Sequence, residues 1–213
     1  MSLLPIFLRL EDRPVLVVGA GTVALGKIES LRAARAAITV VAPQATPQIH
    51  PLVEIGALAW RKRAFEPADL DGAFLVIAAT NSSAVNHAVY EEALRRNILC
   101  NAVDDPPNCD FYFGSVIARG DLQIAISTAG ESPALAQRLR REIDEQLPRD
   151  LGPWLQQLGG LRREIRAGVP AGPQRNLLLH DLAHRSLCAL ETCPTRQFAR
   201  QQADALRKPE VPA

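Results

Sequence analysis

Short apolar runs alternate with segments of helical spacing along the first half of the chain. The helical spacing predicts helices at residues 23–34 and 83–96, the second with Ser82 or Ser83 as its N-cap. The apolar runs predict strands at residues 14–18, 38–42, 57–61, 74–79 and 98–103. Strand and helix in repeated alternation predict an α/β fold, a Rossmann-like parallel sheet with right-handed crossovers, and ligands bind such a sheet beyond the carboxyl ends of its strands.

The alternation stops after residue 113. The segment GSVIARGDLQIAIST predicts two short strands around a turn at residues 119–121. The following SPALAQRLRREIDEQL predicts a helix with Ser132 as cap and an apolar stripe of Leu135, Leu139, Ile143 and Leu147. Further helix is predicted at residues 151–167, and at residues 174–207 with an interruption near residue 193. This strand pair with its helical tail is too small for a core of its own, which favours an interaction arm of a symmetric dimer.

Composition and charge narrow the class of protein. A chain of 213 residues that is 47% hydrophobic can bury a substantial core, and a net charge of +1 gives no general case for nucleic acid binding. No apolar run reaches the roughly 18–20 residues of a membrane span, and the N-terminus lacks the pattern of a signal peptide. The four cysteines form no CxxC pair and are few for this length, which favours reduced thiols. We therefore expect a cytoplasmic protein with no membrane partner.

The first predicted strand leads into VLVVGAGTVALGK, which contains a GxGxxA pattern. In that pattern Gly19 permits the tight turn, Gly21 lets backbone amides approach a pyrophosphate, and Ala24 packs the helix against the strand. The helix N-terminus that follows favours bound phosphate. The pattern predicts dinucleotide binding, and the alternative is a tight strand-to-helix turn without a ligand.

The ends of the second and fourth strands are the other predicted parts of this site. Pro43 and Gln44 stand where an acidic residue commonly holds the adenine ribose, and no arginine beside them favours a 2′-phosphate, so the choice between NAD and NADP stays open. Thr80 and Asn81 follow an apolar strand and are candidates to line the nicotinamide side. Their alternative role is that of an ordinary helix cap.

Two adjacent carboxylates, Asp104 and Asp105, follow the fifth predicted strand and precede two prolines. A carboxylate at this edge of the sheet is suited to proton transfer beside a bound nicotinamide. Asp before Pro is also common in plain turns, so the pattern alone does not decide between these roles.

Four stretches together carry a resemblance to a known family. They are LPIFLRLEDRPVLVVGAGTVALGK, FLVIAAT, CNAVDDPPNCDFYF and GDLQIAISTAGESPALAQRLR. In colinear order over about residues 3–165 they resemble the siroheme synthase family, specifically its precorrin-2 dehydrogenase and sirohydrochlorin ferrochelatase module. Some members fuse this module to a uroporphyrinogen methyltransferase domain, and this chain ends before such a domain could begin.

The resemblance implies an NAD-dependent oxidoreductase of siroheme biosynthesis, a branch of porphyrin biosynthesis, that oxidises precorrin-2 to sirohydrochlorin. Asp104 matches the family's catalytic acid/base, and Asp105 is a helper or a turn residue. The family pattern also assigns Thr22, Val23, Pro43 and Gln44 to NAD contacts. Bifunctional members then act as a lyase, a ferrochelatase that inserts ferrous iron, whereas other members only oxidise; the sequence leaves this second activity and its metal preference open.

The resemblance also implies a division of the chain and weaker site residues. Residues 1–113 would form the NAD-binding Rossmann-like domain, 114–148 the dimerisation region of a homodimer, and 149–213 a helical C-terminal region. Thr128 and Ser132 would lie at the mouth of the substrate site, although a loop or cap role suits Thr128 equally. Arginines 138, 140 and 141 would meet substrate carboxylates or lie on a solvated helix face.

Two alternatives accompany this interpretation. His180, His184 and Cys188 are spaced to share one helix face, but a single helix rarely completes a metal site, so we expect packing there and no metal ligands. A non-catalytic NAD-sensing regulatory module would also explain the glycine motif and the dimer-like tail, but not the carboxylate. Another small-molecule oxidoreductase is a third possibility, and it would need a different substrate-binding region from this short arm. Fold alone does not separate these functions.

Overall fold

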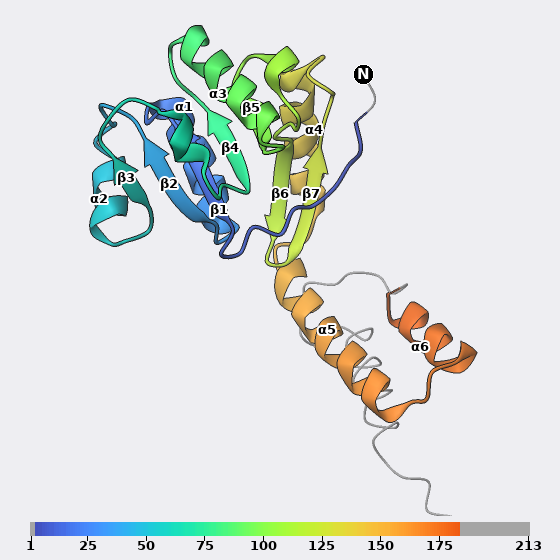
Figure 1. Cartoon of the computed structure of the whole chain (residues 1–213). Helices are drawn as coiled ribbons and strands as arrows, with labels where there is room; N and C mark the ends of the chain where they lie inside the picture. Colours follow the sequence, from blue (N-terminus) through green and yellow to red (C-terminus); the bar gives the residue numbers. More distant parts are fainter. Residues whose placement is uncertain (1–2, 184–213) are drawn as a thin grey trace, which may run out of the picture. The chain divides into compact units, whose positions relative to one another are not determined.

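The computed structural model describes residues 3–183, and its chain divides after Phe113 into two compact units. The first unit holds a five-stranded parallel sheet in the order β3-β2-β1-β4-β5 (Figure 1). Its strands are β1 Pro14–Val18, β2 Ala37–Val41, β3 Ala59–Arg61, β4 Leu75–Ala78 and β5 Leu99–Ala102. The chain leaves the sheet's centre on one side after β1 and returns on the other side at β4. This order creates the switch point between β1 and β4 at which a Rossmann-like sheet binds its ligand.

Helices cover both faces of this sheet, as the alternating strands and helices predict. The helical elements are α1 Thr22–Ala33, α2 Ile49–Glu54, the 3₁₀ helix η1 Pro67–Leu70, α3 Ser83–Arg95 and the 3₁₀ helix η2 Pro106–Asn108. Strand positions and both longer helices lie within one or two residues of their predicted bounds. The short α2 and the two 3₁₀ helices were not predicted.

The core of the first unit consists of two apolar clusters, one on each face of the sheet. Val17 and Ile77 pack with Ile28 of α1 in the first cluster. Leu16 and Val89 of α3 belong to the second. Successive strand residues point to opposite faces, so Leu16 and Val17 contribute to different clusters, as expected for a parallel sheet buried on both sides.

The second unit begins with an antiparallel strand pair, β6 Ser115–Arg119 and β7 Leu122–Ile126, as predicted. Gly120 takes a positive φ of 60° at the turn between them. Three helices follow, α4 Pro133–Gln146, α5 Leu151–Gly168 and α6 Pro173–Ala183. A Cβ on Gly152 would lie 2.8 Å from the Arg119 carbonyl oxygen, so the start of α5 can pack against the hairpin turn only with glycine there.

The expectation that this region is too small for a core was wrong, because its helices have a small core of their own, which contains Leu151, Trp154, Ile165 and Leu182. The predicted apolar stripe on α4 is only partly buried, because Leu135 is 38% exposed whereas its neighbour Ala136 is buried. None of the helices within residues 3–183 is long and apolar enough to cross a membrane. The predicted helix beyond residue 183 lies outside the described residues.

Candidate active site

The turn between β1 and α1 requires glycine at its first position. Gly19 has φ +107°, and its amide donates to the Val41 carbonyl oxygen at 2.9 Å. A Cβ added to Gly19 would lie 2.3 Å from the Ala79 carbonyl oxygen, which is closer than real Cβ atoms approach. The turn therefore runs directly over the end of β4, and only glycine satisfies both the dihedral angle and this contact.

The second glycine of the pattern opens the helix instead of tightening the turn. Gly21 is the N-cap of α1 in an extended conformation, and no side chain caps the helix there. A Cβ on Gly21 would meet no atom within 4 Å. The first-turn amides of α1 thus lack a side-chain acceptor and lie beside open space, an arrangement suited to a phosphate group.

A cavity of about 950 Å³ lies at the carboxyl ends of β1, β2 and β4. It brings together six of the residues predicted for the cofactor, namely Gly19, Gly21, Pro43, Gln44, Thr80 and Asn81. Thr22 and Val23 do not line it; they begin α1 as exposed residues, and Val23 is 52% exposed. Most of the wall is backbone or apolar side chain, which suits a nucleotide that contacts the protein over its full length.

Thr80 is held at the cavity wall by Asn86, a residue that sequence reasoning did not single out. The Thr80 amide and hydroxyl both donate to Asn86 Oδ1, at 3.1 and 2.7 Å, and Asn86 Nδ2 donates to the Thr80 carbonyl at 3.1 Å. Asn86 is buried on α3, whose cap is Ser82, with its hydroxyl accepting from the Val85 amide. The only sequence signal was an asparagine on the inner face of a helix, where an apolar residue is usual.

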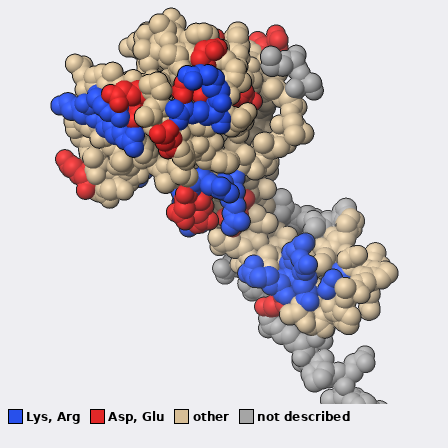
Figure 2. Space-filling model, viewed as in Figure 1, with Lys and Arg blue, Asp and Glu red and all other residues tan. Residues whose placement is uncertain are grey.

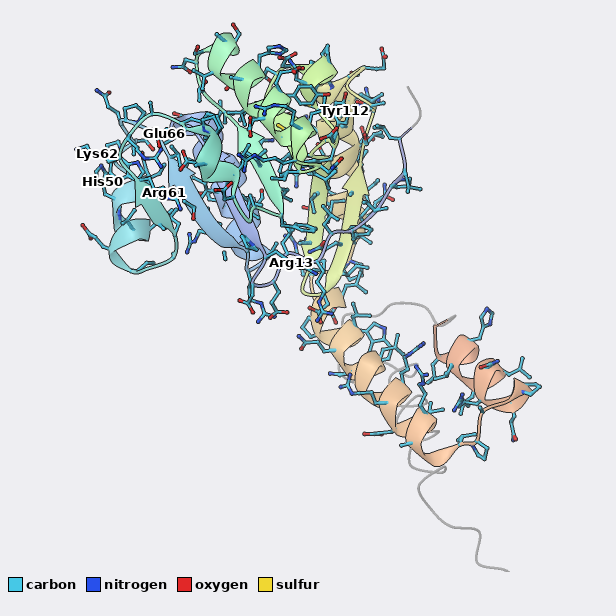
Figure 3. The ribbon with its side chains drawn as sticks, in the orientation of Figure 1. Arg13, His50, Arg61, Lys62, Glu66 and Tyr112 are labelled. Atoms are coloured by element: carbon cyan, nitrogen blue, oxygen red, sulfur yellow. The ribbon has the colours of Figure 1, made fainter. Side chains whose placement is uncertain are left out.

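A buried carboxylate fixes the loop that contributes Phe65 to the cavity. Asp69 accepts hydrogen bonds from Arg61 at 2.6 Å, from both terminal nitrogens of Arg63 at 2.6 and 2.7 Å, and from the Glu66 amide at 2.9 Å. Burial acts to raise the pKa of Asp69, but the hydrogen bonds from Arg63, the Glu66 amide and Arg61 outweigh it and lower the pKa to about 2. Figure 2 shows Lys and Arg atoms gathered at this edge of the sheet, and Figure 3 labels Arg61, Lys62 and Glu66 there.

Asp104 lies in the turn after β5 and not among the residues that line the cavity. It takes a positive φ of 61°, a conformation that aspartate adopts more readily than most side chains, and the turn closes with the Asp105 amide donating to the Ala102 carbonyl at 3.1 Å. Its side chain is exposed. Asp105 is half-buried and accepts from Asn108 Nδ2 at 2.6 Å, which gives it a role in holding η2.

The segment after Asp104 is tied back to β5 by its own side chains. Asn101 Nδ2 donates to the Phe111 carbonyl at 2.7 Å, and the Cys100 amide donates to Asp110 Oδ2 at 2.8 Å. The Cys109 thiol donates to the Ala102 carbonyl at 3.0 Å. These bonds fix the segment that carries the two carboxylates of the sequence motif.

Both described cysteines are protonated thiols at neutral pH. Burial raises the pKa of Cys100 to about 12, and the neighbouring charge of Asp110 adds to this. Burial also raises the pKa of Cys109, which donates a backbone hydrogen bond and lies near three aspartates. A thiol in this state is a poor nucleophile, so neither cysteine is suited to covalent catalysis.

Lys27, which is not among the predicted site residues, interacts electrostatically with Asp104. Lys27 is half-buried on α1, and its Nζ lies 4.1 Å from the centroid of the Phe113 ring. Burial lowers the pKa of Lys27, whereas the charge of Asp104, and that of Cys109 in its ionised form, oppose this change. The ammonium group of α1 thus lies over an aromatic ring of the segment that follows β5.

The weaker predicted residues have local structural roles in the second unit. Ser132 caps α4, because its hydroxyl accepts from the Leu135 amide at 3.3 Å. The Thr128 hydroxyl accepts from the Ser132 amide at 3.2 Å, as a loop role predicts. Arg138 forms an i,i+4 ion pair with Glu142 at 3.3 Å on the exposed face of α4.

No group of three or more His, Cys, Asp or Glu side chains within the described residues could hold a metal ion. Of the predicted histidine and cysteine constellation, only His180 falls in the described part, and it is exposed on α6. His184 and Cys188 lie outside the described residues.

Comparison with known proteins agrees with this geometry. A family model described as putative NAD(P)-binding matches residues 6–115, and one described as the central part of sirohaem biosynthesis proteins matches residues 119–146. Siroheme synthase 1 of Cronobacter sakazakii is 49% identical over 162 residues, which are 76% of this chain and 34% of that protein. Siroheme synthase 1 of Aeromonas hydrophila is 38% identical over 212 residues, which are 99% of this chain and 46% of that protein. The chain thus spans less than half the length of these curated relatives.

One solved structure matches this chain over nearly its whole length. The protein named SirC, precorrin-2 dehydrogenase, superposes with a TM-score of 0.80 at 27% sequence identity, covering 95% of this chain and all of that one. The family model over the sheet unit, the relatives and this structure agree with the resemblance carried by the four sequence stretches. The chain therefore belongs to the siroheme synthase family and corresponds to the part of it that the putative NAD(P)-binding and central sirohaem biosynthesis models describe.

Proposed function

We propose that this protein is an NAD-dependent precorrin-2 dehydrogenase, which oxidises precorrin-2 to sirohydrochlorin in siroheme biosynthesis. One observation carries the proposal: a dinucleotide-sized cavity lies over the Gly19 turn in a chain that matches SirC over nearly its whole length. The substrate is a reduced tetrapyrrole with many carboxylates, and the reaction takes place in the cytoplasm.

The residues of the cavity fit NAD from one end to the other. Pro43 and Gln44 would contact the adenosine, Gly21 and the uncapped start of α1 the pyrophosphate, and Thr80 the nicotinamide side. Bound NAD supplies the acceptor for a hydride. Asn86 fixes the Thr80 backbone and hydroxyl, so the nicotinamide side of the site is preorganised.

Asp104 provides the base for the proton that leaves with this oxidation. Precorrin-2 loses two hydrogens in becoming sirohydrochlorin, one as a hydride to NAD and one as a proton. The Asp104 carboxylate accepts that proton and passes it to water, which its exposure allows. Asp105 keeps the following segment in place through Asn108.

Insertion of ferrous iron into sirohydrochlorin is the second activity we propose to test. The relatives of 49% and 38% identity bear the name siroheme synthase. Here iron is a substrate, and two pyrrole protons must leave as it enters the macrocycle. Asp104 is the group on this chain that would accept them.

We also propose that the protein works as a homodimer through residues 114–148. The support is the exposed apolar surface of this segment, where Val116 is 49% and Leu135 is 38% exposed. Thr128 and Ser132 would then shape the mouth of the substrate site from the same segment. Sedimentation at micromolar concentration measures the mass, and a monomer would contradict this part of the proposal.

Ligand binding and Asp104→Asn distinguish the enzyme from an NAD-sensing module. Titration calorimetry without oxygen should detect binding of both NAD and a polycarboxylate tetrapyrrole to the wild-type protein, whereas a sensor would bind only NAD. Asp104→Asn should keep NAD affinity and lose at least about a hundredfold in oxidation rate, the usual contribution of a general base. Asp121→Asn, another exposed aspartate, serves as the control and should retain activity. Full activity of Asp104→Asn would remove Asp104 from the mechanism.

A further inference from the structure

Two arginines at the end of β3 lie beside the part of the cavity that would hold the adenosine. β3 pairs with β2 so that Arg61 is next to Val41, which lines the cavity. The Arg61 carbonyl accepts a hydrogen bond from the amide of Ala42, another wall residue, at 3.2 Å. The guanidinium group of Arg63 donates through Nη1 to the carbonyl of Ala64, also in the wall, at 2.9 Å. In Rossmann-like sheets an arginine near the adenine ribose holds the 2′-phosphate of NADP.

A buried carboxylate already binds both of these guanidinium groups. Asp69 Oδ1 accepts from Arg61 Nη1 and from Arg63 Nη2, each at 2.6 Å. The other oxygen, Oδ2, accepts from Arg63 Nη1 at 2.7 Å. The Asp69 side chain is fully buried, whereas the side chains of Arg61 and Arg63 are 48% and 39% exposed. The two arginines therefore converge on one internal acceptor at the edge of the cavity.

We propose that Asp69 makes the cavity selective for NAD over NADP, because it holds the two arginines that would otherwise bind the 2′-phosphate. This inference rests on the proposed function, since it concerns the cofactor of that reaction. An acidic residue at the end of β2 commonly makes this choice, but Pro43 and Gln44 stand there. The carboxylate that selects the cofactor comes instead from η1, to which Asp69 belongs.

The donors of Arg63 are already used within the protein. Nη1 has two hydrogens, which go to Asp69 Oδ2 and to the Ala64 carbonyl, and Nη2 donates to Asp69 Oδ1. A phosphate that approached the same edge of this guanidinium group would have to displace a carboxylate that binds it through two parallel hydrogen bonds.

The charges of this cluster also balance. Glu66 Oε2 lies 3.8 Å from Arg63 Nη1, so the two arginines face two carboxylates, Asp69 and Glu66. Burial acts to raise the pKa of Asp69, but its hydrogen bonds lower that pKa to about 2, so the carboxylate is ionised at neutral pH. A phosphate monoester carries about −1.5 to −2 charges at pH 7, and it would meet no net positive charge here.

Lys62, the cation between the two arginines in the sequence, belongs to the other face of the sheet. Its Nζ lies 5.8 Å from the centroid of the Trp60 ring, and Trp60 packs against the apolar cluster that contains Ile28 of α1. Phe65, the wall residue that follows the arginines, packs against the opposite cluster. Figure 3 labels Arg61 and Lys62 at this edge of the sheet. Lys62 thus provides a control cation that Asp69 does not hold.

Titration calorimetry with NAD and with NADP tests the inference without any turnover. The wild-type protein should bind NAD at least about tenfold more tightly than NADP. In Asp69→Asn this ratio should fall at least about tenfold, because two guanidinium groups gain the freedom to bind the 2′-phosphate. Asp71→Asn is the matched control, since Asp71 also pairs with an arginine, Arg96, and it should keep the wild-type ratio. Equal wild-type affinities, or an unchanged ratio in Asp69→Asn, would overturn the inference.

Double variants assign the gained NADP affinity to the arginines. Asp69→Asn with Arg63→Gln should lose the gain, whereas Asp69→Asn with Lys62→Gln should keep it. A gain that survives Arg63→Gln and is lost in Lys62→Gln would overturn the role of the arginines.

Arg61→Gln tests the same role if Asp69→Asn fails to fold, because Arg63 still pairs with Asp69 through two hydrogen bonds. An arginine that Asp69 withholds contributes nothing to NADP binding, so Arg61→Gln should leave the NADP affinity of the wild type unchanged. A tenfold loss of NADP affinity alone would overturn the inference.

Oxidation of precorrin-2 separates this inference from the proposed function. Selective binding of NAD that Asp69→Asn abolishes, without any oxidation of precorrin-2, would reject the proposed function alone. Normal oxidation with the wild-type affinity ratio in Asp69→Asn would reject the role of Asp69 alone.

Discussion

The two glycines of the β1–α1 turn should respond in opposite ways to the same added methyl group. In Gly19→Ala the Cβ would lie 2.3 Å from the Ala79 carbonyl oxygen, at a φ of +107°. The positive φ alone costs an L-residue about 1–2 kcal/mol, and relief of the backbone overlap adds to it, so we expect a loss of about 3 kcal/mol or more in the free energy of unfolding. In Gly21→Ala the Cβ meets no atom within 4 Å, and we expect a loss of about 1 kcal/mol or less.

NAD affinity should be lowered in Gly21→Ala, the variant whose stability changes little. The Cβ of Gly21→Ala occupies space where the pyrophosphate approaches the helix amides, so NAD affinity should fall at least about tenfold, or 1.4 kcal/mol, in a protein that remains folded. Urea unfolding gives the stability of each variant, and calorimetry gives the affinity of Gly21→Ala. For Gly19→Ala the Tm should fall by about 6–12 °C, given about 2–4 °C per kcal/mol for a chain of this size. Wild-type stability in Gly19→Ala, or wild-type NAD affinity in Gly21→Ala, would refute the reasoning.

Three further outcomes follow from buried groups of the sheet unit. Asn86→Ala leaves the Thr80 amide without its acceptor, so it should lower the free energy of unfolding by about 1–3 kcal/mol and weaken NAD binding. Urea unfolding measures the first effect and calorimetry the second. Unchanged NAD affinity would contradict the role of the Thr80 turn. The pKa of Asp69 is lowered from 3.8 to about 2, so its ion pairs stabilise the fold fully above about pH 4 and lose this effect as the pH falls towards 2. Unfolding curves should show that the free energy of unfolding falls by about 2 kcal/mol in this window. Asp69→Asn should not show this pH-dependent fall. The pKa of Cys100 is raised to about 12, so this thiol should resist alkylation near pH 8 until the protein unfolds. Mass spectrometry detects the label, and rapid labelling in native buffer would contradict the burial of Cys100.

Local patterns were sufficient for the sheet and for the cofactor turn. The strands β1 and β2 are mainly β-branched runs. The need for glycine at position 19 follows from a strand that turns at once into a helix. The short α2 was missed because its six residues contain a proline and span less than two turns, too few to establish a helical period. The α4 stripe was predicted only as a shared face, because helical spacing does not show what covers that face.

The site depends partly on contacts between distant segments, which spacing does not reveal. Asn86 could be recognised only once α3 was placed against the end of β4, and Asp69 only once Arg61 and Arg63 converged on it. Asp104 itself was predicted from the family resemblance, because a carboxylate before proline has the local signature of a turn.

The most direct test of the central claim is the stoichiometry of the oxidation. Purified protein, NAD and precorrin-2 are incubated without oxygen, and NADH and sirohydrochlorin are followed by their absorbance. The account predicts one NADH for each sirohydrochlorin formed, at a rate proportional to enzyme concentration. Protein that binds NAD but forms neither product above the rate without enzyme would contradict the account.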